Sequence, residues 1–198
     1  MKKNRTGEEV LSQLPAVERL EAELKREKYR QKYRNVLRST VYTLLVVAAA
    51  AVLIATLWLP VLQIYGESMT PTLFDGDVVI SWKSSDFSTG DVVAFYYNNR
   101  ILVKRVIAGP GDWVDIDQDG TVYVNKQEIV EPYVVEKAFG QCDIELPYQV
   151  PETKVFVMGD HRSVSVDSRS SSIGCVANED IVGRLVFRVW PIGAFGVF

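Results

Sequence analysis

Ser68 and Lys104 are the two residues whose chemistry stands out first in this sequence. Ser68 lies in the segment "GESMTPTL" (66–73), and Lys104 interrupts the apolar run "ILVKRVIA" (101–108). Alternate residues of a strand share a face, and both faces of this run are mostly apolar, so the lysine is expected to be buried. Burial disfavours a charged amine and lowers its pKa from about 10.4. A neutral Lys104 amine could then be the general base that a serine hydroxyl needs before it attacks.

Both residues also have ordinary structural explanations. The Lys104 amine could reach water along its flexible stem, or it could pair with a carboxylate such as Asp91 or Asp112. By spacing alone, Ser68 could be an ordinary turn serine. Gly66 has no Cβ and would allow a close approach of the backbone, where N–H groups could hold a developing oxyanion. The residue types permit a Ser/Lys pair, and the elements around them decide whether the two side chains meet.

Short β-branched and aromatic runs, separated by turn signals, predict the elements that position this pair. Asn98-Asn99 is a two-residue hairpin signal that joins the second and third runs. Strands this short and this regularly broken predict a mainly β domain, an antiparallel barrel or sandwich, with a small excursion at 125–153. The runs are "DVVIS" (77–81), "DVVAFYY" (91–97), "ILVKRVIA" (101–108), "WVDI" (113–116), "TVYV" (121–124), "KVFVMGD" (154–160) and "IVGRLVFRVW" (181–190).

An uncharged segment of 28 residues, from Ser39 to Gly66, precedes these strands. A helix needs about 20 apolar residues to cross a hydrocarbon core of about 30 Å, and Val41–Leu59 supplies them, with Trp58 near its far end where an interfacial indole would lie. A cleaved signal peptide would have a shorter apolar run nearer to the start of the chain. A buried helix of a soluble protein would be less uniformly apolar. We therefore expect a membrane span.

The charges on either side of the span predict its orientation. Residues 1–38 carry 11 Lys/Arg and 6 Asp/Glu, whereas the rest of the chain carries 11 and 19. The positive-inside rule places the basic flank in the cytoplasm. The sequence thus predicts a charged helical cytoplasmic tail (1–38), a transmembrane helix (39–62) and an extracytoplasmic domain (63–198), in a single-pass protein of the plasma membrane. The basic flank could also lie against anionic headgroups.

The two cysteines, Cys142 and Cys175, would both lie outside the cell, where a disulfide is chemically permitted. Two small buried thiols are an equally good interpretation. No CxxC motif or Cys/His spacing indicates a metal site.

Three segments, in order behind an apolar span, carry a resemblance to a known family. "GESMTPTL" (66–73), "VKRVIAGPGD" (103–112) and "VMGDHRSVSVDSR" (157–169) resemble the successive signature segments of bacterial type I signal peptidases, and "IGCVANEDIVGRLVFRVWP" (173–191) is similar to the segment that follows them. The resemblance covers about residues 57–191 and is closest to the Gram-positive pattern.

The resemblance implies a membrane-bound serine endopeptidase that cleaves signal peptides from secreted precursors after small residues. In it, Ser68 corresponds to the nucleophile, Lys104 to the general base, and Ser165 to a serine that orients the lysine amine. The oxyanion would be held at Ser68 and Gly66. Asp167 with Arg169, and Asp160 with Arg105, correspond to residues that form structural salt bridges beside the site. The residues that correspond to the lining of the substrate pockets are Ile64, Met69, Leu73 and Val103.

Two positions depart from the family pattern. Gly66 replaces a serine that adds a hydroxyl to the oxyanion hole in some members, and His161 replaces the usual asparagine of "GDNR". The extracytoplasmic domain is also short, which suggests that a second, non-catalytic region is reduced to about residues 125–153.

The resemblance further implies that the partners are secreted precursors and the lipid membrane, with no metal, cofactor or nucleic acid. Oligomeric state is left open. Three alternatives remain: a sortase-like transpeptidase that uses Cys175 or Cys142 with His161, a Ser/His/Asp hydrolase that depends on His161, and a catalytically inactive, membrane-anchored β-domain that binds peptides.

Overall fold

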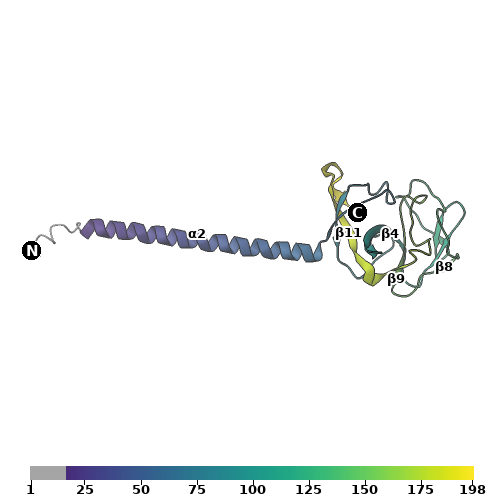
Figure 1. Cartoon of the computed structure of the whole chain (residues 1–198), viewed down its shortest axis with the longest axis horizontal. Coiled ribbons are helices and arrows are strands. Elements are labelled where there is room, and N and C mark those ends of the chain that lie inside the picture. Colours follow the sequence, from purple (N-terminus) through teal and green to yellow (C-terminus); the bar gives the residue numbers. More distant parts are fainter. Residues whose placement is uncertain (1–16) are drawn as a thin grey trace, which may run out of the picture. The chain divides into compact units, whose positions relative to one another are not determined.

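The computed structural model describes residues 17–198, and these form two units (Figure 1): a helical unit that ends at Leu53 and a β unit from Ile54 to Phe198. Residues 1–16, which belong to the predicted cytoplasmic tail, lie outside the described residues. The side chain of Trp58, predicted at the far end of the span, lies outside them as well.

The predicted tail helix and the predicted span are one continuous helix, α2 (Val17–Trp58). Its Arg19–Leu57 stretch is long and apolar enough to cross a bilayer, by its length and composition. The helix ends before the predicted residue 62 because Pro60 has no N–H to donate and disfavours a helical conformation at Leu59. The next residues, Val61–Gln63, already form a strand.

The larger sheet confirms the predicted antiparallel β architecture. Its strands follow the order β1-β2-β11-β3-β4-β9-β10, β12 pairs with β11, and every pair is antiparallel. Two 3₁₀ turns, Asn178–Asp180 and Ile192–Ala194, flank β11. The strands are β1 (Val61–Gln63), β2 (Val78–Trp82), β3 (Val92–Tyr97), β4 (Arg100–Ala108), β9 (Lys154–Met158), β10 (Val176–Ala177), β11 (Ile181–Trp190) and β12 (Gly196–Val197).

A second sheet forms between β4 and β9 along the chain. Its order is β7-β6-β5-β8, with β5 (Trp113–Ile116), β6 (Val122–Val124), β7 (Gln127–Glu128) and β8 (Tyr148–Gln149). The predicted excursion at 125–153 is therefore the second half of a larger insertion that begins with β5. Val114 and Ile116 face the core from β5, whereas Trp113 and Asp115 are exposed, which is the alternation expected of a half-buried strand.

The hairpin of β3 and β4 is the element that carries Lys104. Asn98 and Asn99 have φ values of 45° and 62°, as a two-residue turn with a left-handed backbone requires, so the predicted turn is confirmed. The β3 residues Val93 and Phe95 pack in one buried cluster, and Val92 and Ala94 pack in another. Both faces are covered over Val92–Phe95 and Lys104–Ala108, as the apolar runs predicted, whereas the tip of the hairpin around Tyr96 and Ile101 is exposed.

Only half of β4 has a strand on each side. β3 pairs with β4 along the whole hairpin, from Val92 opposite Arg105 to Tyr97 opposite Arg100. β9 pairs with β4 only from Arg105 onward. In the described part of the chain, residues 100–104 therefore keep one strand edge open, and β1 lies at the end of the same sheet with its outer edge open too.

Candidate active site

Ser68 lies in a tight loop between β1 and β2. Backbone hydrogen bonds from Ile64 N to Asp77 O (2.8 Å) and from Gly76 N to Ile64 O (3.0 Å) close the base of this loop. At its tip, the Thr70 N–H donates to the Glu67 carbonyl over 3.1 Å, which makes Ser68 a central residue of a β-turn. The loop thus fixes the backbone of Ser68 at the end of the β1 strand.

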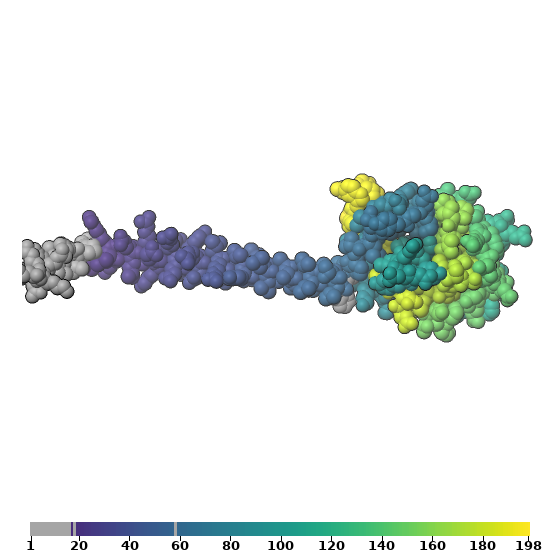
Figure 2. Space-filling model, in the orientation of Figure 1, coloured from purple at the N-terminus to yellow at the C-terminus, as the bar shows by residue number. Residues whose placement is uncertain are grey.

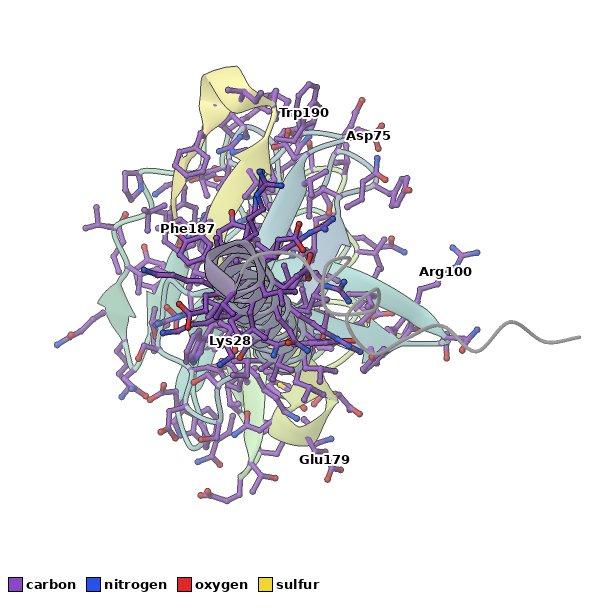
Figure 3. The ribbon with its side chains drawn as sticks, turned by 90° about the vertical axis from the view of Figure 1, so that its left-hand side faces the viewer. Lys28, Asp75, Arg100, Glu179, Phe187 and Trp190 are labelled. Carbon is purple, nitrogen blue, oxygen red and sulfur yellow. The ribbon has the colours of Figure 1, made fainter. Side chains whose placement is uncertain are left out.

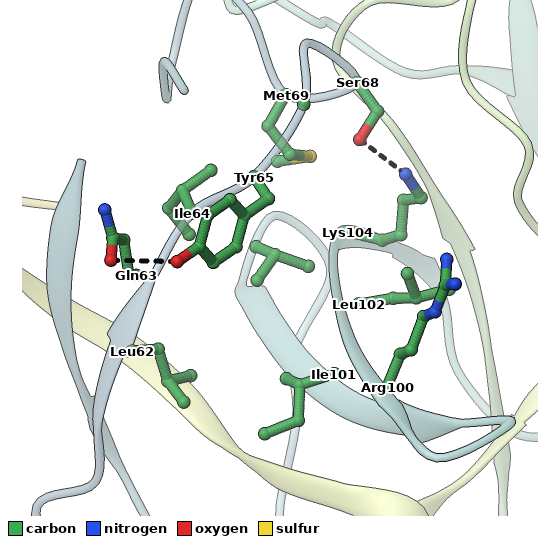
Figure 4. A pocket seen from close by; sticks show the side chains of 12 residues that line it. Leu62, Gln63, Ile64, Tyr65, Ser68, Met69, Arg100, Ile101, Leu102 and Lys104 are labelled. Atoms are coloured by element: carbon green, nitrogen blue, oxygen red, sulfur yellow. Dashed lines mark hydrogen bonds between the residues drawn. The ribbon is translucent and has the colours of Figure 1, made fainter. Parts of the chain in front are cut away.

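Lys104 reaches this turn from β4. Its Nζ atom lies 2.6 Å from the Ser68 Oγ atom (Figure 4), and the residue is only 4% exposed. Loss of solvent around the amine lowers the pKa of Lys104 from 10.5 to about 8; the Asp167 carboxylate opposes this fall, the Arg169 guanidinium adds to it, and Asp160 opposes it. A substantial fraction of the amine is therefore neutral near pH 8, which is what a general base requires.

Buried ion pairs surround the lysine. Arg105 forks onto Asp160 with distances of 2.8 and 2.6 Å, and the Thr72 hydroxyl also donates to Asp160. Arg169 forks onto Asp167 with distances of 2.8 and 2.9 Å, and both side chains are fully buried. Because each carboxylate is already paired with a guanidinium, neither forms an ion pair with Lys104 that would stabilise its ammonium form.

A third buried pair was not identified from the sequence. Arg162 binds Glu131 through two hydrogen bonds, one of 3.0 Å, and both side chains are buried. Glu131 also accepts from the Tyr133 hydroxyl (3.0 Å), while the Tyr133 ring lies 3.8 Å from the Arg105 guanidinium carbon. Residues 131–133 of the insertion therefore cover the polar side of the site.

A groove of about 560 Å³ leads to Ser68 and Lys104 between β1 and the open half of β4. In Figure 2 the teal surface of the β3–β4 hairpin adjoins the blue surface of the residues that precede it in the β unit. Figure 3 shows Arg100 projecting outward from the hairpin. The remaining lining residues are Leu62, Gln63, Ile64, Tyr65, Gly66, Met69, Arg100, Ile101, Leu102 and Val103.

Comparisons with known proteins show which family this chain resembles. A family model described as signal peptidase, peptidase S26, matches residues 37–190. Signal peptidase IB of Staphylococcus aureus (strain Mu50) is 38% identical over 152 residues, which cover 67% of this chain and 78% of that protein. The chain belongs to the signal peptidase family. It is a serine peptidase that cleaves signal peptides, and the relatives of this family are membrane-anchored.

Two further relatives extend the range of similar proteins. The thylakoidal processing peptidase 1 of Arabidopsis thaliana is 37% identical over 146 residues, or 65% of this chain and 41% of that protein. The crystal structure of a signal peptidase I from Enterococcus faecalis V583 is 29% identical and covers 51% of this chain and 97% of the other, with a TM-score of 0.45.

In this signal peptidase, the groove includes three of the four predicted pocket residues. Ile64, Met69 and Val103 line it, whereas Leu73 does not. Leu73 is fully buried and packs behind the groove with Ile64 and Met69, so it supports the lining from the core. Gln63 and Tyr65, which form a hydrogen bond of 3.0 Å with each other, lie at the groove and were not identified from the sequence. No local signal marks these two residues, because the sequence does not distinguish β1 from the end of the preceding helix.

Ser165 lies close to the Ser68 backbone, but the expected hydrogen bond to Lys104 is not formed. The Ser165 Oγ atom is buried and has no hydrogen-bond partner among the described residues. A Cβ built on Gly159 would lie 2.2 Å from this oxygen and 2.5 Å from the Ser68 carbonyl, so Gly159 is what lets the two serines approach. A buried hydroxyl without a partner costs free energy, which favours a rotation that would satisfy it.

The two predicted oxyanion positions differ in this signal peptidase. The Gly66 N–H donates to Asp75 Oδ1 over 2.7 Å, so this donor is occupied and the prediction for Gly66 is not supported. Gly66 instead serves the turn, because its φ of 88° favours glycine. Within residues 17–198, the structure assigns no acceptor to the Ser68 N–H, which leaves this donor available.

The His161 ring and the cysteines, on which the alternative mechanisms depend, are not the partners of the Ser68 hydroxyl. The His161 ring nitrogen Nδ1 contacts Thr70 Oγ1 at 3.0 Å, while Ser68 Oγ contacts Lys104. Both cysteines are free thiols, and burial raises the pKa of Cys175 to about 11, which disfavours the thiolate that a sortase-like mechanism needs.

Proposed function

We propose that Ser68 is the nucleophile and Lys104 the general base with which this signal peptidase cleaves secreted precursors. The contact of 2.6 Å between the Lys104 amine and the Ser68 hydroxyl, inside a buried site, carries the proposal. The pKa of about 8 supports it, because an amine that is partly neutral can accept the proton of Ser68 as the bond to substrate forms.

The reaction needs two proton transfers in each half. Lys104 takes the Ser68 proton while Oγ attacks the scissile carbonyl, and the Ser68 N–H stabilises the oxyanion. The ammonium of Lys104 then gives its proton to the leaving amine, so the peptide bond breaks and an acyl-enzyme remains. In the second half, Lys104 takes a proton from water, water attacks the ester, and the proton returns to Ser68.

The Ser165 hydroxyl, which has no hydrogen-bond partner among the described residues, is proposed to orient the Lys104 amine during this cycle. Once Ser68 Oγ is bonded to the acyl group, the Lys104 amine loses its contact with a free hydroxyl. We propose that Ser165 Oγ, which is buried and lacks a partner, then accepts a hydrogen bond from the amine and holds it toward the incoming water. The Asp167–Arg169 and Asp160–Arg105 pairs would keep the surrounding segments in place.

The precursor is proposed to bind as an extended strand between β1 and the open half of β4. Both edges line the groove, so the added strand could form backbone hydrogen bonds while alternate side chains enter pockets. Ile64, Met69 and Val103 give those pockets an apolar floor backed by Leu73, which favours small side chains like those at the ends of signal peptides.

The proposed orientation has the N-terminus in the cytoplasm and the β unit outside. The 11 Lys/Arg of residues 1–38 support it through the positive-inside rule. Ser68 follows Trp58, the last residue of α2, by ten positions, a reach of at most about 36 Å of extended chain. A tethered site and a membrane-held precursor would then meet at a raised effective concentration.

Cleavage of a precursor by the full chain in liposomes tests the proposal. Wild type should release the mature protein, and both Ser68→Ala and Lys104→Ala should lose this activity by at least about a thousandfold, as removal of either member of a catalytic unit does. Cys175→Ala, the matched control, should keep wild-type activity. If Lys104→Ala cleaves normally, or if only Cys175→Ala is inactive, the proposed mechanism is wrong.

A further inference from the structure

His161 makes more connections at the site than its place in the mechanism requires. Its backbone N–H donates to the Ser68 carbonyl over 3.1 Å, and its own carbonyl accepts from the Ser165 N–H over 3.1 Å. Its ring nitrogen Nδ1 lies 3.0 Å from Thr70 Oγ1. One residue therefore joins the turn that carries Ser68 to the turn that carries Ser165.

The direction of the ring hydrogen bond follows from the contacts of Thr70. The Thr70 hydroxyl lies 2.8 Å from the Glu67 carbonyl, which can only accept, so the single hydroxyl proton points there. The oxygen of Thr70 can then only accept from His161, and Nδ1 must carry a hydrogen. Both the neutral ring with Nδ1–H and the protonated ring provide this donor.

The series of hydrogen bonds that starts at the His161 ring ends on the turn that carries Ser68. Glu67 and Thr70 are the outer residues of the β-turn whose central residues are Ser68 and Met69, and the Glu67 carbonyl receives both the N–H and the hydroxyl of Thr70. The backbone bonds of His161 could be made by any residue at this position. The ring adds a contact between Thr70, on the far side of the turn, and the 159–165 segment, next to the hydrogen bond from the Thr72 hydroxyl to Asp160.

We propose that His161 is a positioning residue, which holds the Ser68 turn in register with Lys104 through the chain Nδ1–H to Thr70 to Glu67. An asparagine side chain could replace it, because its amide also presents an N–H donor at short reach from the backbone. An apolar ring of similar size could not. This inference rests on the proposed roles of Ser68 and Lys104.

The expected effect is mainly on turnover. Most of the groove lining comes from residues 62–66 and 100–104, which the His161 ring does not contact, and only Met69 and Ser68 belong to the turn, so KM should change less than kcat. Loss of the ring donor should lower kcat about 10- to 100-fold, because small displacements of a reacting group have effects of this size. His161→Asn should keep kcat within about threefold of wild type by supplying the same donor.

The test measures kcat, KM and thermal unfolding of the full chain in detergent with a peptide substrate. His161→Phe should lower kcat, His161→Asn should restore it, and Thr70→Val should lower it, whereas Thr70→Ser should retain it. In a Thr70→Val background, His161→Phe should cost nothing further, since its acceptor is already gone. Thr121→Val makes the same side-chain change immediately before β6 and should leave kcat unaltered.

Three results would overturn the inference: wild-type kcat in a folded His161→Phe variant, no rescue by asparagine, or additive losses in the double variant. If His161→Phe does not fold, the Thr70→Val and Thr70→Ser pair decides, and full kcat in Thr70→Val contradicts it. Ser68→Ala and Lys104→Ala are assayed alongside. If Ser68→Ala and Lys104→Ala are inactive while His161→Phe is fully active, only the positioning role is rejected. If Lys104→Ala is active, the proposed dyad itself is rejected.

Discussion

The Lys104 amine is almost completely buried, and this single fact affects both the activity and the stability of the protein. Burial is the largest cause of its lowered pKa. The negative charges of Asp167 and Asp160 raise the pKa again only in part, because each carboxylate is bound to an arginine. The neutral state that catalysis needs is thus favoured by the same burial that makes the charged state costly.

The first consequence is a rise of activity with pH. With a pKa of about 8, the neutral fraction of Lys104 falls about tenfold for each pH unit below that value, and kcat/KM should fall with it. The measurement is peptide cleavage between pH 5.5 and 9. Lys104→Arg should be inactive throughout, because a guanidinium does not lose its proton in this range. A flat profile between pH 6 and 8 would contradict the assignment of the base.

The second consequence is that Lys104 destabilises the fold at neutral pH. Its pKa is lowered from 10.5 to about 8 on folding, so the unfolded chain binds more protons between these values and stability rises with pH across that window. Below pH 8 the full cost is present, on the order of 3 kcal/mol from the size of the shift. Lys104→Met should therefore unfold at higher urea concentration at pH 6.5, and this advantage should disappear near pH 10.5. An unchanged or lowered midpoint at pH 6.5 would count against the burial argument.

At the scale of elements, local signals predicted most strands. Nearly continuous β-branched and aromatic runs and the Asn98-Asn99 turn specify β3 and β4 without help from distant residues, so their bounds were close to those of the structure. β1 was merged with the membrane helix because a short uncharged strand after Pro60 has the hydropathy of a helix end. Leu73 was assigned to the pocket, and packing from other strands places it in the core.

Some features of the site could likewise be predicted from local sequence, whereas others depend on residues that are distant along the chain. The residue types of Ser68 and Lys104 were readable in the sequence, and the resemblance related them. Their contact depends on a loop, a hairpin and a groove that no single segment specifies. Glu131 could not be identified, because its partner Arg162 lies 31 positions away and neither residue marks the pairing locally. The rotamer of Ser165, which leaves its hydroxyl without a partner, is likewise a product of packing.

The end of β9 shows how an element can limit the site. Gly159 follows Met158, and a methyl group there would meet Ser165 Oγ at 2.2 Å and the Ser68 carbonyl at 2.5 Å. Gly159→Ala should lower kcat at least about 100-fold by displacing the Ser68 turn, and should cost about 1–3 kcal/mol of stability. Cleavage assays and urea unfolding measure both. Gly193→Ala, where no atom lies within 4 Å of the new methyl group, is the matched control and should match wild type. An active Gly159→Ala would show that the turn tolerates the displacement.

At the scale of the whole β unit, a loop of the insertion contacts the arginines beside the active site. Glu131 and Tyr133 lie in the insertion, yet they contact Arg162 and Arg105, which flank the site in the larger sheet. Three buried ion pairs therefore surround the site, and the insertion supplies one of their carboxylates. We therefore expect the larger sheet to depend on this part of the insertion for the pairing of Arg162.

Removal of the Glu131 charge tests that dependence. The Arg162 and Glu131 side chains are 0% and 1% exposed, so Glu131→Gln leaves a buried guanidinium without its counter-charge. We expect a loss of about 3–5 kcal/mol in the free energy of unfolding, and a fall in Tm of at least about 6 °C. Glu128→Gln makes the same change at the exposed pair with Lys137, whose side chains are 56% and 43% exposed, and should alter stability by less than about 0.5 kcal/mol. Equal effects of the two substitutions, measured by thermal and urea unfolding, would mean that the insertion unfolds independently of the site.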